Sequence, residues 1–156
     1  PNTGVLVPKV YPYVDYGLFS KMGWSPNEKY DYEKDCCDAI VVNLGTNDAS
    51  YTRDSSKHIH EFQEAYRDFL RYLRLTHKNI PIICVSGAMT ELLCDEIKAA
   101  VETLRDTDND DRIYYLRFAG PETEDGEGAV GHPSVRRHEK MAQQLSDWIR
   151  DNKVLS

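Results

Sequence analysis

The stretch from residue 38 to residue 51, DAIVVNLGTNDASY, joins a strand signal directly to a polar loop. Its apolar, largely β-branched run at 39–42 predicts a strand buried on both faces of a parallel sheet. Gly45, Asn47 and Asp48 follow at the carboxyl end of that strand, where open α/β folds bind ligands. Gly45 permits a positive φ, Asn47 offers amide donors, and Asp48 offers an acceptor for nearby N–H groups. The same residue types also form simple turns, so a second motif has to decide between the two interpretations.

Composition and charge narrow the class of protein. The chain has 156 residues, 40% hydrophobic and 29% charged, as expected of one globular domain. A net charge of −7 argues against nucleic acid or an anionic membrane as partner, and no apolar run approaches the length of a membrane span. A neutral substrate fits this balance best. Four cysteines (Cys36, Cys37, Cys84 and Cys94) lack metal-ligand spacing, and their usage does not fix the compartment.

Strand and helix signals alternate along the rest of the chain. Helical periodicity covers 55–77, 90–104 and 134–151, and apolar strand-like runs cover 82–85 and 113–118. This order predicts a βαβαβα core at 38–156 with parallel strands, right-handed crossovers and helices over the sheet. Three strands make a thin sheet, and the chain opens on Pro1. We therefore expect a single domain, 1–156, that lacks at least one amino-terminal strand.

The first part of the chain, 1–37, is rich in aromatic residues, Pro and Gly and has no sustained period. We expect an irregular connection with one short helical turn near 16–22. Its rings either cover one face of the sheet or form a substrate wall. In the second case Trp24 would offer a flat apolar face to a sugar or an acyl group.

The second motif, Gly131-His132-Pro133-Ser134, stands between the third strand and the last helix. A histidine there also lies at the carboxyl edge of the sheet, where it can face the same crevice as Asn47. Histidine is the side chain best suited to accept and return a proton near neutral pH. Taken alone, a histidine just before a helix is more often a capping or surface residue.

Together, LGTND at 44–48 and GHPSVRRHEKMA at 131–142 resemble the SGNH (GDSL-type) hydrolases, and most closely their carbohydrate-esterase branch. The resemblance covers about residues 38–152. It implies a flavodoxin-like three-layer α/β/α sandwich with a parallel sheet and serine-esterase chemistry. By this resemblance His132 matches the general base, Asn47 the oxyanion-hole amide and Asp48 the acid beside it, with Gly45 in the substrate-binding block.

The sequence departs from the family pattern in three places. The Gly-Asp-Ser block that carries the nucleophile is absent, and Gly4 is the one candidate for the glycine of the next block. Many family members have an Asp three residues before the histidine, and here that residue is Ala129. Asp125 and Glu127 are nearby but offset, so a backbone carbonyl or another acid would have to orient the imidazole.

A nucleophile within the chain is not apparent from its pattern. Ser50, Ser86 and Ser134 do not sit in a Gly-flanked strand-to-helix elbow, and Ser86 comes closest. His58 and His60 are two apart on a predicted helix, so we expect no metal site there or at His77.

We therefore predict an ester hydrolase that needs no cofactor or metal and takes its serine from an upstream segment. It removes short acyl groups, and we expect these to be acetyl groups on carbohydrate. The chain alone should be inactive. The alternative is a non-catalytic module that binds carbohydrate or protein in the sheet-edge crevice. A flavodoxin-like nucleotide binder is a weaker third option, because the chain has no Gly-rich phosphate loop. An open sheet edge would also allow two copies to pair.

Overall fold

The computed structural model describes residues 6–15, 21–22, 28–34 and 37–155. The chain divides into two compact units, Pro1–Cys36 and Cys37–Ser156, and each is described by itself. Two expectations, Trp24 as a substrate wall and most of the helical turn near 16–22, lie outside the described residues.

The first unit contains more local structure than the irregular connection that its sequence predicts. A short helix, α1 (Val7–Val10), has proline in its first turn, where a missing N–H costs nothing. Farther along, Tyr13 and Lys29 form an antiparallel bridge. The rings of Tyr11 and Tyr32 stack at 5.4 Å, and the Tyr32 hydroxyl donates a hydrogen bond to the Tyr11 carbonyl at 2.6 Å.

The second unit is built on a parallel sheet in the order β1-β2-β3, which confirms the predicted parallel arrangement. Its strands are β1 (Ile40–Val42), β2 (Ile82–Ser86) and β3 (Ile113–Arg117). Because β2 is paired on both sides and covered on both faces, all five of its residues are buried.

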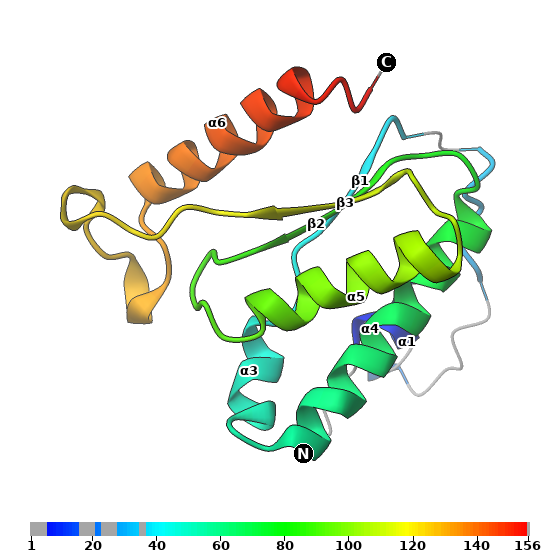
Figure 1. Ribbon diagram of the computed structural model, residues 1–156, viewed down its shortest axis with the longest axis horizontal. Helices are drawn as coiled ribbons and strands as arrows, with labels where there is room; N and C mark the ends of the chain where they lie inside the picture. The colour runs from blue at the N-terminus through cyan, green and yellow to red at the C-terminus, as the bar shows by residue number, and fades with distance from the viewer. Residues whose placement is uncertain (1–5, 16–20, 23–27, 35–36, 156) are drawn as a thin grey trace. The chain divides into compact units, whose positions relative to one another are not determined.

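Helices cover both faces of the sheet, so the unit has the predicted three-layer α/β/α architecture. Helices α4 (Ser56–Thr76) and α5 (Cys94–Thr107) pack on one face, and α6 (Val135–Asp151) lies over the other (Figure 1). The core beneath α6 is a cluster of six buried apolar residues: Ile83, Val85, Leu116, Phe118, Met141 and Val154. Among the helices of the described residues, none is long and apolar enough to cross a bilayer.

Local capping explains where the helices begin. Ser55, where the predicted helical periodicity begins, accepts a hydrogen bond from the His58 N–H at 3.3 Å and so caps α4. The predicted start of α5 at Thr90 is wrong, because the helix begins only at Cys94. The residue before it, Leu93, has a left-handed backbone (φ 66), which a right-handed helix cannot contain.

Two expectations about burial are also wrong. The strand β1 is not buried on both faces, since Val41 is 46% exposed. Helix α6 covers β2 and β3, whose residues form the core cluster beneath that helix. Strand β1 lies at the edge of the sheet, outside this cluster. Val135 and Ala142 belong to the apolar residues whose spacing in 134–151 predicts an inward face, but both are exposed. They lie seven residues apart on the outer face of α6, whereas Met141, Leu145 and Trp148 pack against the sheet.

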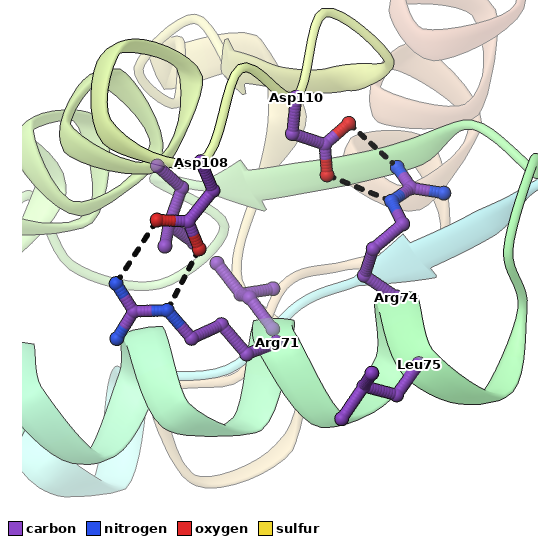
Figure 2. Close-up of a pocket in the computed structure, with 7 residues that line it drawn as sticks. Arg71, Arg74, Leu75, Asp108 and Asp110 are labelled. Atoms are coloured by element: carbon purple, nitrogen blue, oxygen red, sulfur yellow. Dashed lines mark hydrogen bonds and ion pairs between the residues drawn. The ribbon is translucent and has the colours of Figure 1, made fainter.

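Arg74 connects the end of α4 to the starts of β2 and β3. Its guanidinium pairs with both carboxylate oxygens of Asp110, at 2.7 and 3.1 Å (Figure 2). The same guanidinium also donates to four backbone carbonyls, those of His77, Lys78, Ile80 and Arg112. One side chain therefore satisfies acceptors from several turns at the amino edge of the sheet.

We expect Arg74→Ala to lower the free energy of unfolding by about 3 kcal/mol, because it leaves a largely buried carboxylate and several carbonyls without donors. The matched control is Arg71→Ala. Arg71 pairs with Asp108 in the same two-bond geometry, but its side chain is 45% exposed, against 21% for Arg74. The control should cost less than about 1 kcal/mol. Urea denaturation measures both, and equal losses would contradict this account of Arg74.

The hollow around these two ion pairs is not a candidate active site. It has a volume of about 260 Å³ and is lined by both arginines, by Asp108 and Asp110, and by apolar side chains that include Leu75 (Figure 2). Each charged group that lines it already has an ionic partner. It also lies at the amino edge of the sheet, opposite the edge where α/β folds bind ligands.

Candidate functional site

The Gly-Thr-Asn-Asp block is the start of a helix that the sequence did not reveal. Helix α3 (Thr46–Thr52) begins directly after Gly45. Gly45 has φ 120, as anticipated, and a Cβ atom there would lie 3.0 Å from the Ile97 side chain. The position therefore requires glycine for its backbone conformation and its close packing.

Asn47 and Asp48 occupy the first turn of α3, at the carboxyl end of β1. Asn47 is exposed and Asp48 is half-buried. The amide of Asn47 is thus available to an external acceptor, and the Asp48 carboxylate lies where the helix dipole favours negative charge. Gly45 itself is buried against α5, and its role in substrate binding stays a prediction.

His132 lies in the loop between β3 and α6, at the carboxyl end of β3. Its Nδ1 is 2.9 Å from the carbonyl oxygen of Ala129, which also accepts the His132 backbone N–H at 3.1 Å. A carbonyl oxygen can only accept, so Nδ1 carries a proton in this contact, and in the neutral imidazole the lone pair is on Nε2. Nε2 is therefore the atom that can act as a base.

At the position where many family members have an acid, the backbone carbonyl of Ala129 holds the His132 ring through this hydrogen bond. Asp125 does not do so: its buried carboxylate pairs with Lys140 at 2.6 Å and accepts the Glu122 N–H at 2.9 Å. The hydrogen bond from Lys140 holds the pKa of Asp125 below its ordinary value. Glu127 contributes a backbone bridge to Pro133. Of the two orienting groups left open by the sequence, the backbone carbonyl is the one found.

Several bonds hold this loop against α6. Ser134 caps the helix by accepting the Arg137 N–H at 3.1 Å, and its hydroxyl donates to the Asp125 carbonyl at 2.5 Å. The buried Arg137 guanidinium donates to the carbonyls of Ala119 and Gly120. These bonds fix both ends of the segment that presents His132.

Sequence reasoning missed the Lys140–Asp125 pair. The available signal was a lysine one and a half helical turns into α6 and an acid-rich loop ahead of the helix. That signal does not tell which of the loop's acids the lysine pairs with, because the answer depends on the loop conformation.

Asn47 and His132 both follow carboxyl ends of strands in the same parallel sheet, and Figure 1 shows α3 and the loop after β3 at that edge. The strands that precede them, β1 and β3, flank β2. The two strands are thus about 10 Å apart, since neighbouring strands lie about 4.8 Å apart. No hydrogen bond joins the two side chains within the described part of the chain. Their cooperation on one substrate stays a prediction.

The structure removes Ser86 as a nucleophile. Its hydroxyl is buried and bonded to the Tyr115 hydroxyl at 2.7 Å and to Cys94 Sγ at 3.2 Å. Ser134 is occupied as the cap of α6. Burial also raises the pKa of the Cys84 thiol to about 12, which makes it unreactive.

The other histidines have separate environments. His58 stacks on Tyr51 at 4.4 Å, His60 lies 3.8 Å from Glu64, and His77 is buried. Across the described ranges, no three His, Cys, Asp or Glu side chains are grouped so that they could hold a metal ion.

Two comparisons with known sequences both match this chain to esterases and acylhydrolases. A family model described as GDSL-like Lipase/Acylhydrolase matches residues 12–145. The cellulase/esterase CelE of Acetivibrio thermocellus is 30% identical over 128 residues, which is 79% of this chain and 15% of that protein.

Solved structures show the same fold. An acetyl xylan esterase (Est2A) from the rumen bacterium Butyrivibrio proteoclasticus gives a TM-score of 0.81 at 24% identity, over 95% of this chain and 46% of that one. An active-site mutant of a family two carbohydrate esterase from Clostridium thermocellum gives 0.79 at 25% identity, over 95% and 43%. The chain thus spans less than half the length of the proteins that it resembles.

Proposed function

Because the chain belongs to the GDSL-like lipase/acylhydrolase family, we propose that it supplies the base and the oxyanion donor of a serine esterase that removes acetyl groups from carbohydrate. The observation that carries the proposal is the hydrogen bond from His132 Nδ1 to the Ala129 carbonyl, which leaves Nε2 as a free acceptor. The matched relatives include carbohydrate esterases and an acetyl xylan esterase, which supports this substrate class.

In the proposed mechanism a serine hydroxyl attacks the ester carbonyl while His132 Nε2 takes its proton. The Asn47 amide donates to the oxygen that becomes negatively charged, and Asp48 supports the position of that block. The imidazolium then protonates the departing alcohol. In the second half of the cycle, His132 activates water to release the acyl group from the serine.

We propose that the serine comes from a strand that pairs with β1. The Ile40 N–H donates to the Pro81 carbonyl at 2.9 Å, toward β2, so the peptide groups of its neighbour Val41 point to the outer edge. A parallel strand added there would end beside Gly45 and Asn47. The alternative occupant of this edge is β1 of a second copy, which would make the chain a dimer.

The test compares two proteins: the longest polypeptide that the gene encodes, and the 156-residue chain alone. We expect the longer protein to release acetate from acetylated xylan and from p-nitrophenyl acetate, and the chain alone to release none above background, since it would lack the nucleophile. Esterase activity of the 156-residue chain alone would contradict the proposal that the serine lies outside it. Sedimentation of the chain at several concentrations measures whether copies pair.

A second candidate, carbohydrate binding without chemistry, is favoured by one observation. In the first unit the ring of Tyr32 lies 5.4 Å from the ring of Tyr11 and 5.0 Å from the ring of Tyr30. Such aromatic faces suit the apolar faces of sugars. A longer protein that binds xylan oligosaccharides and cleaves no acetyl ester would establish this candidate instead.

A further inference from the structure

Val130 combines two unfavourable features, both immediately beside the predicted base. Its backbone has φ 54 and ψ 42, a left-handed conformation that is rare for a β-branched residue. Its side chain is 93% exposed, so burial within the chain does not offset the strain. Backbone outliers of this kind concentrate at active sites and ligand-binding loops.

The same turn that strains Val130 also orients His132. Its first residue, Ala129, accepts both hydrogen bonds from His132, and Gly131 has φ 72. The turn is closed by the Gly128 N–H, which donates to the His132 carbonyl at 2.9 Å. A Cβ atom on Gly128 would lie 2.6 Å from the Pro133 carbonyl oxygen. The turn therefore fixes the position of the apolar Val130 side chain relative to the imidazole of His132, two residues away.

The chemistry of the reaction indicates which part of an ester this side chain would meet. His132 returns its proton to the departing alcohol, so the loop that carries it lies on the alcohol side of the ester. The proposed oxyanion donor, Asn47, stands in the first turn of α3, after β1, and so would lie on the carbonyl side. In a carbohydrate ester the alcohol is a sugar, whose C–H faces are apolar.

We propose that Val130 is a specificity-determining residue that packs against the C–H face of the sugar in the alcohol part of the ester. This inference rests on the proposed esterase function. It adds a prediction that the function alone does not make: Val130 should distinguish esters by their alcohol and not by their acyl group.

The experiment uses the longest polypeptide that the gene encodes, with Val130→Gly and Val130→Thr. Each variant is assayed on three esters: an acetylated xylo-oligosaccharide, ethyl acetate, and the butyrate ester of the same oligosaccharide. Val130→Gly suits the left-handed backbone and removes the side chain, whereas Val130→Thr keeps the shape and replaces one methyl group with a hydroxyl. Leu75→Ala is the matched control, because it removes an exposed aliphatic side chain from α4 at the opposite edge.

We expect Val130→Gly to raise KM for both sugar esters about tenfold, the effect of one lost apolar contact, with kcat and the ethyl acetate rate unchanged. Val130→Thr should raise KM for the sugar esters by about threefold. The melting temperature of Val130→Gly should not fall, since glycine relieves the strain. Leu75→Ala should change no kinetic constant.

Each other result counts against the inference in a distinguishable way. If both variants keep the wild-type KM for the sugar esters, or alter the acetate-to-butyrate preference, Val130 does not contact the sugar. An equal fall of kcat on all three esters would assign Val130 to the positioning of His132 instead. A wild-type protein that cleaves none of the three esters would refute the proposed function itself, and this inference with it.

Discussion

Replacing His132 by alanine should lower kcat for acetyl ester hydrolysis by about 10⁵–10⁶, leaving little beyond what binding and the oxyanion donor provide. The reason is that Nε2 is the acceptor left free by the hydrogen bond between Nδ1 and the Ala129 carbonyl. Without it, the serine hydroxyl has no base and the departing alcohol no acid. The measurement is acetate release by the longest polypeptide that the gene encodes, with the variant in the same background.

The effect should be chemical and not structural. His132 is exposed, so its removal should change the free energy of unfolding by less than about 1 kcal/mol. His138→Ala is the matched control: it removes an exposed imidazole six residues later, in the first two turns of α6, and should keep full activity. Added imidazole should restore part of the activity of His132→Ala. A variant that retains wild-type turnover would move the base elsewhere and end the assignment.

The architecture could be predicted because its signals are local. The continuous apolar run of β2 predicts a buried strand, and the apolar residues of α4 and α5, spaced three and four apart, predict helices. Their alternation then gives a parallel sheet with helices on both faces. The error at Val41 arose because a β-branched run does not report whether the strand lies at an edge.

The loops could not be predicted in the same way. Left-handed backbones at Leu93 and Val130 are conformations that their side chains disfavour, so propensity gives no hint of them. They arise because the surrounding structure imposes them. The start of α3 was missed for a related reason, since Gly, Thr, Asn and Asp form turns and helix starts equally well.

The positions of the candidate residues at the carboxyl edge of the sheet could be predicted from the sequence, whereas their hydrogen-bond partners could be predicted less well. Asn47 and His132 stand out because each follows a strand, and a parallel sheet brings all carboxyl ends to one edge. From the sequence, the group that orients His132 could be either a backbone carbonyl or an acid. The choice depends on the turn at 129–132, in which Ala129 supplies its carbonyl, while Asp125 is held by Lys140.

Asn47→Ala should lower kcat by about 10²–10³ and change KM little, because an oxyanion donor acts on charge that exists only in the transition state. Asn47 is exposed in the first turn of α3, so its loss should leave the fold intact. Asn47→Asp should be worse than Asn47→Ala, since a carboxylate at this position would repel the developing negative charge. The measurement is steady-state hydrolysis of p-nitrophenyl acetate and of an acetylated xylo-oligosaccharide.

The two substrates separate an oxyanion donor from a sugar contact. Loss of the oxyanion donor slows both esters by the same factor, because the carbonyl is common to them, whereas loss of a sugar contact raises KM for the oligosaccharide alone. Asn79→Ala, an exposed amide in the turn before β2 at the opposite edge, is the matched control and should leave both rates unchanged. If Asn47→Ala keeps its kcat on both esters, the amide does not meet the carbonyl oxygen. The imidazole and the amide would then belong to different sites, although one sheet edge carries both.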